Sequence, residues 1–157
     1  MSRDEALAAI RRQFAADIVE VAEKSAARVY VEIRPQALLA VATCLFRDLG
    51  ARFNTASGVD ARGRMEILYH FSLEGQNLLV SLRVKLDRER PEVDSLTTLI
   101  KGANWIEREI HELLGVAFRG HPRPERLLLP EEWPEGVHPL RSEYVEWDPK
   151  AVRDRGV

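Results

Sequence analysis

The side chains best suited to chemistry in this 157-residue chain are four histidines and one cysteine. In the helical pattern His-Glu-x-x-His, two histidines one turn apart bind zinc. His111-Glu112 begins like this pattern, but Gly115 occupies the position of the second histidine. The other histidines match no standard zinc spacing, although a site assembled in space from distant residues stays open. They are His70, which we expect on a solvated sheet face, His121 and His138.

Other catalytic patterns are absent from the sequence. It contains no Gly-x-Ser-x-Gly elbow, phosphate-binding Gly-rich loop or dinucleotide fingerprint. The single cysteine, Cys44, excludes an internal disulfide and Cys-rich metal or cluster sites, and we expect it to be a buried, inert thiol. Nearby carboxylates such as Glu107 and Glu109 are expected to be solvated. We therefore predict no catalytic, cofactor-binding or metal-binding residues in this chain.

Charge and hydropathy exclude further classes. The chain has 23 basic and 25 acidic residues and a net charge of -2, which offers no basic field for nucleic acid. No apolar run approaches the ~18–20 residues of a membrane-spanning helix. The N-terminus lacks the apolar segment of a signal peptide. We expect a cytoplasmic chain that reaches a membrane only through a partner.

Hydrophobic periodicity predicts the elements that position these side chains. A capping box of Ser2 and Glu5 starts the first helix, and strict alternation predicts a hairpin over about 64–86. A last helix is expected from Ser95 or Leu96 to Gly115. The further elements expected are strands at 18–22, 28–34 and 51–57, a helix at 35–50, a turn at 58–63 and a polar link at 87–94. The order predicts a two-layer α+β domain, α-β-β-α-β-β-β-α, with a mixed sheet and helices on one face.

The last helix carries an apolar face that is expected to pack on the sheet. Trp105 falls on the opposite side, among Arg108, Glu109 and Glu112. A tryptophan there is not explained by the core of the domain. Two interpretations stay open together: the following segment folds back over it, or the surface binds a partner, since Trp and Arg are enriched at interface hot spots.

Residues 119–157 hold six of the eight prolines and are expected to form an irregular arm after a domain at 1–118. Arginines and aromatic side chains alternate along it, a composition suited to docking on a partner subunit. The alternative is a tail that covers its own domain. The predicted partner interface comprises Trp105, Arg108, Glu109, Glu112, Phe118, His121, Arg126, Trp133, Arg141 and Tyr144.

A series of motifs in this region resembles the 30-kilodalton subunit of respiratory complex I and the matching subunits of membrane-bound energy-converting [NiFe] hydrogenases. The close match covers 97–144. Its motifs are Ala103-Asn104-Trp105-Ile106-Glu107-Arg108-Glu109, Glu112-Leu113-Leu114-Gly115-Val116-Ala117-Phe118, Gly120-His121-Pro122, Arg126-Leu127-Leu128 and Pro139-Leu140-Arg141.

The resemblance implies a scaffold subunit without a cofactor, which packs against the large catalytic subunit and an iron–sulfur subunit. Those partners are expected to carry [4Fe-4S] clusters and a NiFe centre. The complex is expected on the cytoplasmic side of the cell membrane. By resemblance, Glu107-Arg108-Glu109 and Gly120-His121-Pro122 hold the arm and its partner contacts in place.

The resemblance is closer to the hydrogenase branch in the run Leu129-Pro130-Glu131-Glu132-Trp133-Pro134 followed by Gly136-Val137. Complex I members commonly have an aromatic residue and an acid in place of His111-Glu112, and Lys in place of Ser142. The sequence thus favours a [NiFe] hydrogenase subunit. The alternatives are the 30-kilodalton subunit of an NADH–quinone oxidoreductase (complex I) and, more distantly, a stand-alone adaptor or enzyme.

Overall fold

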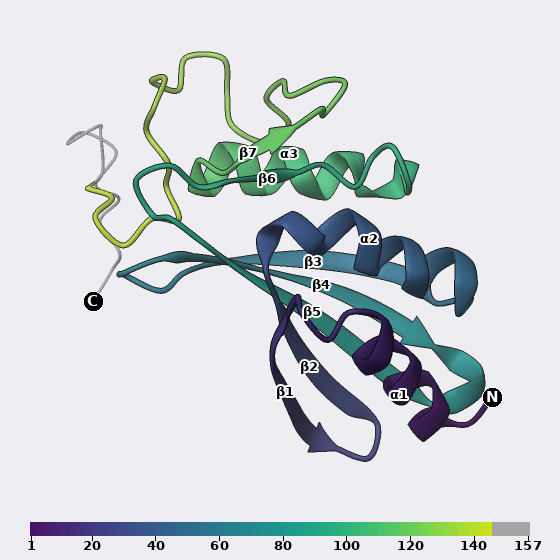
Figure 1. Ribbon diagram of the computed structural model, residues 1–157. Coiled ribbons are helices and arrows are strands. Elements are labelled where there is room, and N and C mark those ends of the chain that lie inside the picture. Colours follow the sequence, from purple (N-terminus) through teal and green to yellow (C-terminus); the bar gives the residue numbers. More distant parts are fainter. Residues whose placement is uncertain (146–157) are drawn as a thin grey trace, which may run out of the picture.

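The computed structural model describes residues 1–145, and its centre is a five-stranded sheet in the order β1-β2-β5-β4-β3 (Figure 1). The pair β2–β5 is parallel and the other pairs are antiparallel, which confirms the predicted mixed sheet. The strands are β1 (Ile18–Ser25), β2 (Arg28–Ile33), β3 (Arg52–Asp60), β4 (Met65–Leu73) and β5 (Leu78–Leu86).

Three helices pack on one face of this sheet, which confirms the two-layer α+β architecture (Figure 1). They are α1 (Arg3–Gln13), α2 (Leu38–Thr43) and α3 (Asn104–Leu114). The capping box predicted for α1 is present at Ser2 and Glu5. The predicted helix at 35–50 consists of a 3₁₀ turn, α2 and a π turn in succession, and it stops at Gly50, whose φ is 67°.

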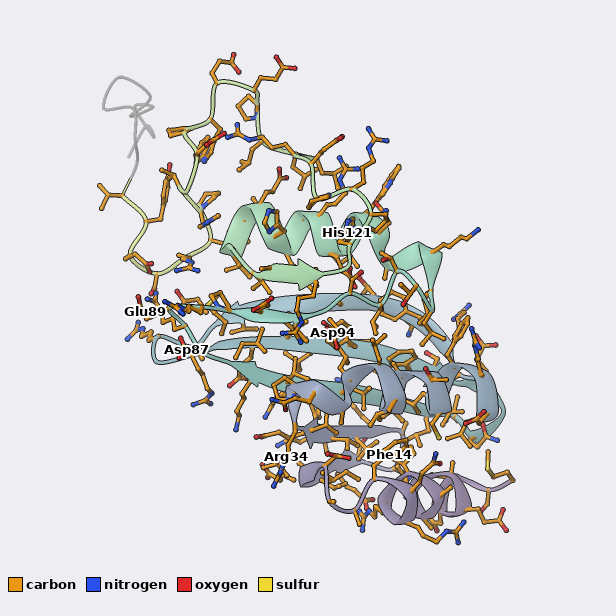
Figure 2. The ribbon with its side chains drawn as sticks, turned by 45° about the horizontal axis from the view of Figure 1, so that its top comes forward. Phe14, Arg34, Asp87, Glu89, Asp94 and His121 are labelled. Atoms are coloured by element: carbon orange, nitrogen blue, oxygen red, sulfur yellow. The ribbon has the colours of Figure 1, made fainter. Side chains whose placement is uncertain are left out.

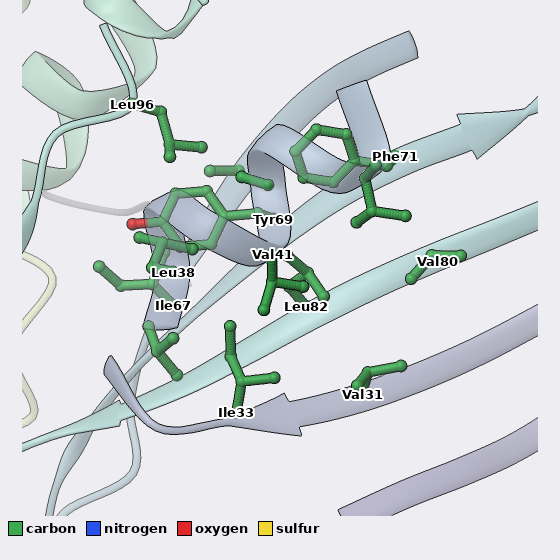
Figure 3. Packing of buried hydrophobic residues seen from close by; sticks show 14 of the residues in the cluster. Val31, Ile33, Leu38, Val41, Ile67, Tyr69, Phe71, Val80, Leu82 and Leu96 are labelled. Atoms are coloured by element: carbon green, nitrogen blue, oxygen red, sulfur yellow. The ribbon is translucent and has the colours of Figure 1, made fainter. Parts of the chain in front are cut away.

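The hairpin β4–β5 provides most of the sheet side of the core. Alternate side chains are buried along both strands, as the period-2 pattern predicts. Figure 3 shows Tyr69 and Phe71 of β4 beside Leu82 of β5 and Val41 of α2. Each large apolar side chain buried in this way stabilises the fold by roughly 1.5–3 kcal/mol.

The predicted start of the last helix is wrong. α3 begins at Asn104, and the preceding residues form turns in which Leu99 N and Ile100 N donate to Leu96 O. Leu96 is nevertheless fully buried, so its apolar character reflects core packing and not helical periodicity. The predicted turn at 58–63 is also partly wrong, because β3 continues through Gly58 to Asp60.

Two short strands escaped prediction. β6 (Glu92–Asp94) lies in the expected polar link, and it pairs in parallel with β7 (Ala117–Arg119), at the expected domain boundary. Arg119 Nε donates to Asp94 Oδ1 across the pair at 2.8 Å. Residues 120–145 form turns and bends without helix or strand. The division into 1–118 and 119–157 stays a prediction, and its last part, 146–157, lies outside the described residues.

Candidate interface around helix α3

α3 lies very close to β3 at the edge of the sheet. A Cβ atom added to Gly58 would lie 2.4 Å from Leu114 Cδ1 and 3.2 Å from Ile110 Cγ2. An alanine at this crossing would force the Leu114 side chain to move, so glycine lets the helix approach the strand backbone. The helix ends at Gly115 in the left-handed conformation, with φ at 75°. Because Ile110 and Leu114 lie against β3, the other sides of α3 are left for the arm and for a partner.

The inner face of α3 carries a buried acid, so the expectation that Glu107 is solvated is wrong. Its side chain is fully buried and accepts hydrogen bonds from Ser95 Oγ at 2.5 Å and from Leu96 N at 2.7 Å. Burial raises the pKa of Glu107 to about 7, although these two hydrogen bonds act in the opposite direction. Glu107 thus ties α3 to the turn that precedes it.

The next side of α3 binds the arm through two charged side chains. Arg108 donates to Glu125 O at 2.9 Å and to Arg126 O at 2.6 Å. The Glu112 carboxylate accepts from three successive backbone N–H groups, at 2.6–3.3 Å. The donors are Leu127, Leu128 and Leu129. Both side chains are buried, and they leave the arm little freedom to slide along the helix.

The arm also caps the carboxyl end of α3, whose last carbonyl groups lack partners within the helix. His138 Nδ1 donates to Glu112 O at 2.9 Å, and Arg141 Nε donates to Leu114 O at 2.8 Å. Leu140 N donates to Leu113 O at 3.0 Å. A cation at this end also complements the helix dipole.

Inside the arm, the predicted interface residues bind one another and the backbone. Arg126 donates to Pro130 O at 2.7 Å and to the carbonyls of Glu131 and Trp133. Trp133 Nε1 donates to Val137 O at 2.8 Å, and its ring stacks on Tyr144 with centroids 6.0 Å apart. Polar groups that looked like partner contacts thus give the arm its internal shape.

The turn that starts the arm is attached to the amino end of α3 by His121, which Figure 2 labels beside the helix. Its Nε2 lies 3.1 Å from Asn104 O, and its Nδ1 accepts from Arg123 N at 3.0 Å, an arrangement that requires the proton on Nε2. Phe118 is buried in β7. His121, Phe118 and Arg108 line a hollow of about 270 Å³ with Glu107.

A further attachment could not be read from the sequence. Asp60, at the end of β3, accepts from Arg88 Nη2 at 2.9 Å and from Ser142 N and Oγ at 2.8 and 3.0 Å. The Arg88 guanidinium holds the pKa of the Asp60 carboxyl well below its usual range. Arg88 also pairs with Glu143. This cluster ties the described end of the arm to the sheet.

One side of α3 remains uncovered by the described part of the arm. Trp105 is 70% exposed, so residues 119–145 do not fold over it, in contrast to one of the two interpretations of the sequence. Glu109 and Leu113 follow it at one-turn spacing and are half-buried. Leu140 of the arm, 59% exposed, lies at the end of this row. We call Trp105, Ile106, Glu109, Leu113 and Leu140 the open stripe.

The ten predicted interface residues therefore divide into two groups. Eight are bound or buried within the chain, and two, Trp105 and Glu109, belong to the open stripe. Whether any of the ten contacts a partner stays a prediction. Among residues 1–145 no group of three or more His, Cys, Asp and Glu side chains is placed to hold a metal ion. In the same range no helix is long and apolar enough to cross a membrane.

Comparison with known proteins gives the family. The sequence model described as "Respiratory-chain NADH dehydrogenase, 30 Kd subunit" matches residues 31–149. An NADH-quinone oxidoreductase subunit of Roseiflexus sp. (strain RS-1) is 42% identical over 119 residues, which cover 72% of this chain and 67% of the relative. Formate hydrogenlyase subunit 5 of Escherichia coli (strain K12) is 29% identical over 145 residues, 90% of this chain and 26% of the relative.

A solved structure agrees with the fold. The structure of the membrane-bound sulfane sulfur reductase, an archaeal respiratory membrane complex, contains a similar chain with a TM-score of 0.79. The likeness covers 92% of this chain and 86% of that one at 16% sequence identity. With the motifs around α3, the matched residues show that the chain belongs to the family of the 30-kilodalton subunit of respiratory-chain NADH dehydrogenase.

Proposed function

We propose that the chain is a non-catalytic scaffold subunit, which packs against the large subunit in the peripheral electron-transfer arm of a membrane-associated redox complex. The observation that carries the proposal is the open stripe. Its tryptophan is 70% exposed in a row that is otherwise mostly apolar, on a helix whose other sides are packed. Exposed aromatic and apolar side chains gathered on one rigid element are typical of protein interfaces.

The docked arm supports the same role. Polar side chains fix its described part to α3 from His121 to Arg141, so this part and the helix form one preformed surface. A preformed surface loses less conformational entropy on binding than a flexible tail does. A scaffold of this kind would hold the large subunit so that electron-transfer distances keep their values.

Trp105→Ala tests the proposal. Truncation of an interface tryptophan often weakens binding by about 2 kcal/mol or more, whereas an exposed side chain contributes less than about 0.5 kcal/mol to folding. We expect the variant to melt like the wild type and to recover much less large subunit in a pull-down read by mass spectrometry. Val19→Ala, at an exposed apolar position on β1, is the matched control. Equal recovery with both variants would contradict the proposal.

Within this role we propose the hydrogenase type of complex, in which the partners hold [4Fe-4S] clusters and a NiFe centre. The support is the run from Leu129 to Gly136, which shapes the arm through Trp133, and the formate hydrogenlyase relative, which aligns with 90% of the chain. The purified complex is expected to contain nickel, and the large subunit to contain two pairs of cysteines able to bind it. The isolated chain is expected to contain neither iron, nickel nor flavin.

The second candidate is the corresponding subunit of an NADH–quinone oxidoreductase. It is favoured by the 42% identity to the Roseiflexus relative, which is higher than the 29% identity to the hydrogenlyase subunit. The same pull-down decides between them. A large subunit that lacks the cysteine pairs, in a complex without nickel, would establish the quinone-reducing type and reject the hydrogenase type.

A further inference from the structure

The two edge strands of the sheet differ in how they are protected. Unpaired backbone groups on an edge strand can bind another chain, and proteins usually block them with irregularities and charges. β1 shows register shifts at both ends, and its Glu23 binds Arg3 and Arg11. β3 has one shift, between Phe53 and Thr55, and pairs regularly with β4 from Thr55 to Asp60. β3 thus presents six consecutive regular residues at an open edge.

The backbone of β3 borders a hollow of about 230 Å³. Ala56, Ser57 and Gly58 form its strand side, and Ile106, Glu109 and Leu113 form its helix side, with Leu140 of the arm at one end. No residue in 1–145 pairs with the outer edge of β3. Figure 1 shows α3 running beside this strand. An unpaired strand edge therefore lies next to a hollow with apolar side chains on its helix side.

The charged side chain in this hollow, Glu109, has no hydrogen-bond or ion-pair partner within residues 1–145. Ile106, Leu113 and Leu140 surround the same hollow. A half-buried carboxylate among apolar groups favours a partner that brings a cation. The neighbouring Trp105 offers an exposed ring to apolar or cationic side chains.

We infer that the outer edge of β3 accepts an extended segment of the partner subunit as a sixth strand, with apolar side chains in the hollow and a Lys or Arg at Glu109. In strand addition, backbone hydrogen bonds supply affinity, and pockets that receive alternate side chains supply specificity. β3 provides the free backbone groups, and the hollow against Ile106 and Leu113 provides a pocket for side chains. The identity of the occupant as a partner subunit rests on the proposed function.

Hydrogen exchange on the intact complex tests the added strand. In an antiparallel pair only alternate amides bond the neighbouring strand, so the amides within 55–60 that point away from β4 are the ones to follow. We expect these amides to exchange at least about tenfold more slowly in the complex than in the isolated full-length chain. Amides of β1, the other edge of the same sheet, are expected to exchange alike in both. Protection of these outward-pointing amides that is already present in the isolated chain would mean that residues 146–157 cover the edge. Protection that grows with the concentration of the isolated chain would mean that a second copy of the chain binds the edge. Either result overturns the inference.

A charge reversal tests the side chains. Glu109→Lys is expected to lower recovery of the complex about tenfold and to remove the protection at 55–60 in what is recovered. Glu20→Lys, the same change on the exposed edge strand β1, is the matched control and should alter neither. A wild-type complex that forms with unprotected β3 amides would overturn the added strand and leave the scaffold role intact. Failure to recover any large subunit with the wild-type chain would reject the proposed function itself.

Discussion

Buried side chains in the sheet layer are mostly apolar, whereas the arm is attached to α3 by polar side chains that bind backbone groups. Burial of apolar surface is non-directional and is shared among many residues. The polar attachments are directional and few, so each depends on a single side chain. The described part of the arm can therefore be released locally, by loss of one side chain, while the sheet stays folded.

Phe71→Ala should have the largest effect, because it opens a cavity in the sheet layer. Phe71 is fully buried, and such truncations cost about 3–5 kcal/mol. Urea denaturation should show one cooperative transition shifted to much lower urea. Leu68→Ala, on the half-exposed outer face of the same strand, is the control and should cost far less. Similar losses in both would show that the inner face is not the main source of stability.

Glu107 is an acidic anchor whose side chain is fully buried beside the apolar core. Its folded-state pKa of about 7 lies above the usual 4.5, so between these pH values the folded state keeps a proton that the unfolded state loses. The contribution of the protonated Glu107 to the free energy of unfolding is therefore complete below pH 4.5 and is lost as the pH rises through 7.

We expect wild-type stability to fall relative to Glu107→Gln by about 3 kcal/mol between pH 4.5 and 8. The prediction concerns the difference in stability between wild type and variant. His70, whose pKa is lowered by burial, makes the stability of both proteins rise with pH, and this effect cancels in the difference. Denaturation midpoints at several pH values measure it. A constant difference across this range would show that Glu107 is ionised when folded.

The sequence predicted the sheet layer far better than the attachments of the arm. Alternation in 65–86 is a local pattern, and it identified the inward-facing residues of β4 and β5 directly. The start of α3 was missed because Leu96 is apolar for a tertiary reason, and the hydrogen bond between its N–H and Glu107 leaves no periodic signal. Trp105 was placed correctly, since helical geometry alone puts it opposite the core.

The arm was unpredictable in detail because its contacts join residues distant in sequence. Glu112 binds backbone groups 15–17 positions away, and Ser142 binds Asp60 across 82 positions. Backbone acceptors and donors carry no side-chain signature that sequence could reveal. In the sequence, an Arg or Glu that binds the arm of its own chain therefore cannot be distinguished from one that binds a partner.

Glu112→Gln should have an intermediate effect. The change removes the negative charge and part of the acceptor capacity that hold three N–H groups, a loss of about 1–2 kcal/mol in local stability. Trypsin should cleave after Arg126 roughly 5–30 times faster, while the urea midpoint of the sheet changes little. Glu109→Gln, on the same helix without a partner in 1–145, is the control. A large shift of the urea midpoint would mean that arm and sheet unfold together.

Ser142→Ala should have the smallest effect, because it removes only the hydrogen bonds of the hydroxyl group, one of them a long one from Arg88, and leaves that of the backbone N–H. The Oγ donor to Asp60 is lost, whereas the backbone N–H of residue 142 still donates and Arg88 still pairs with Asp60. A hydrogen bond to a charged group in a half-exposed place contributes about 0.5–1 kcal/mol, so cleavage after Arg141 should rise only about two- to fivefold. Cleavage after Arg126 is the internal control, since Glu112 holds that segment independently. If both sites opened together in this variant, the arm would be one cooperative unit, and the view of separate single-residue attachments would be wrong.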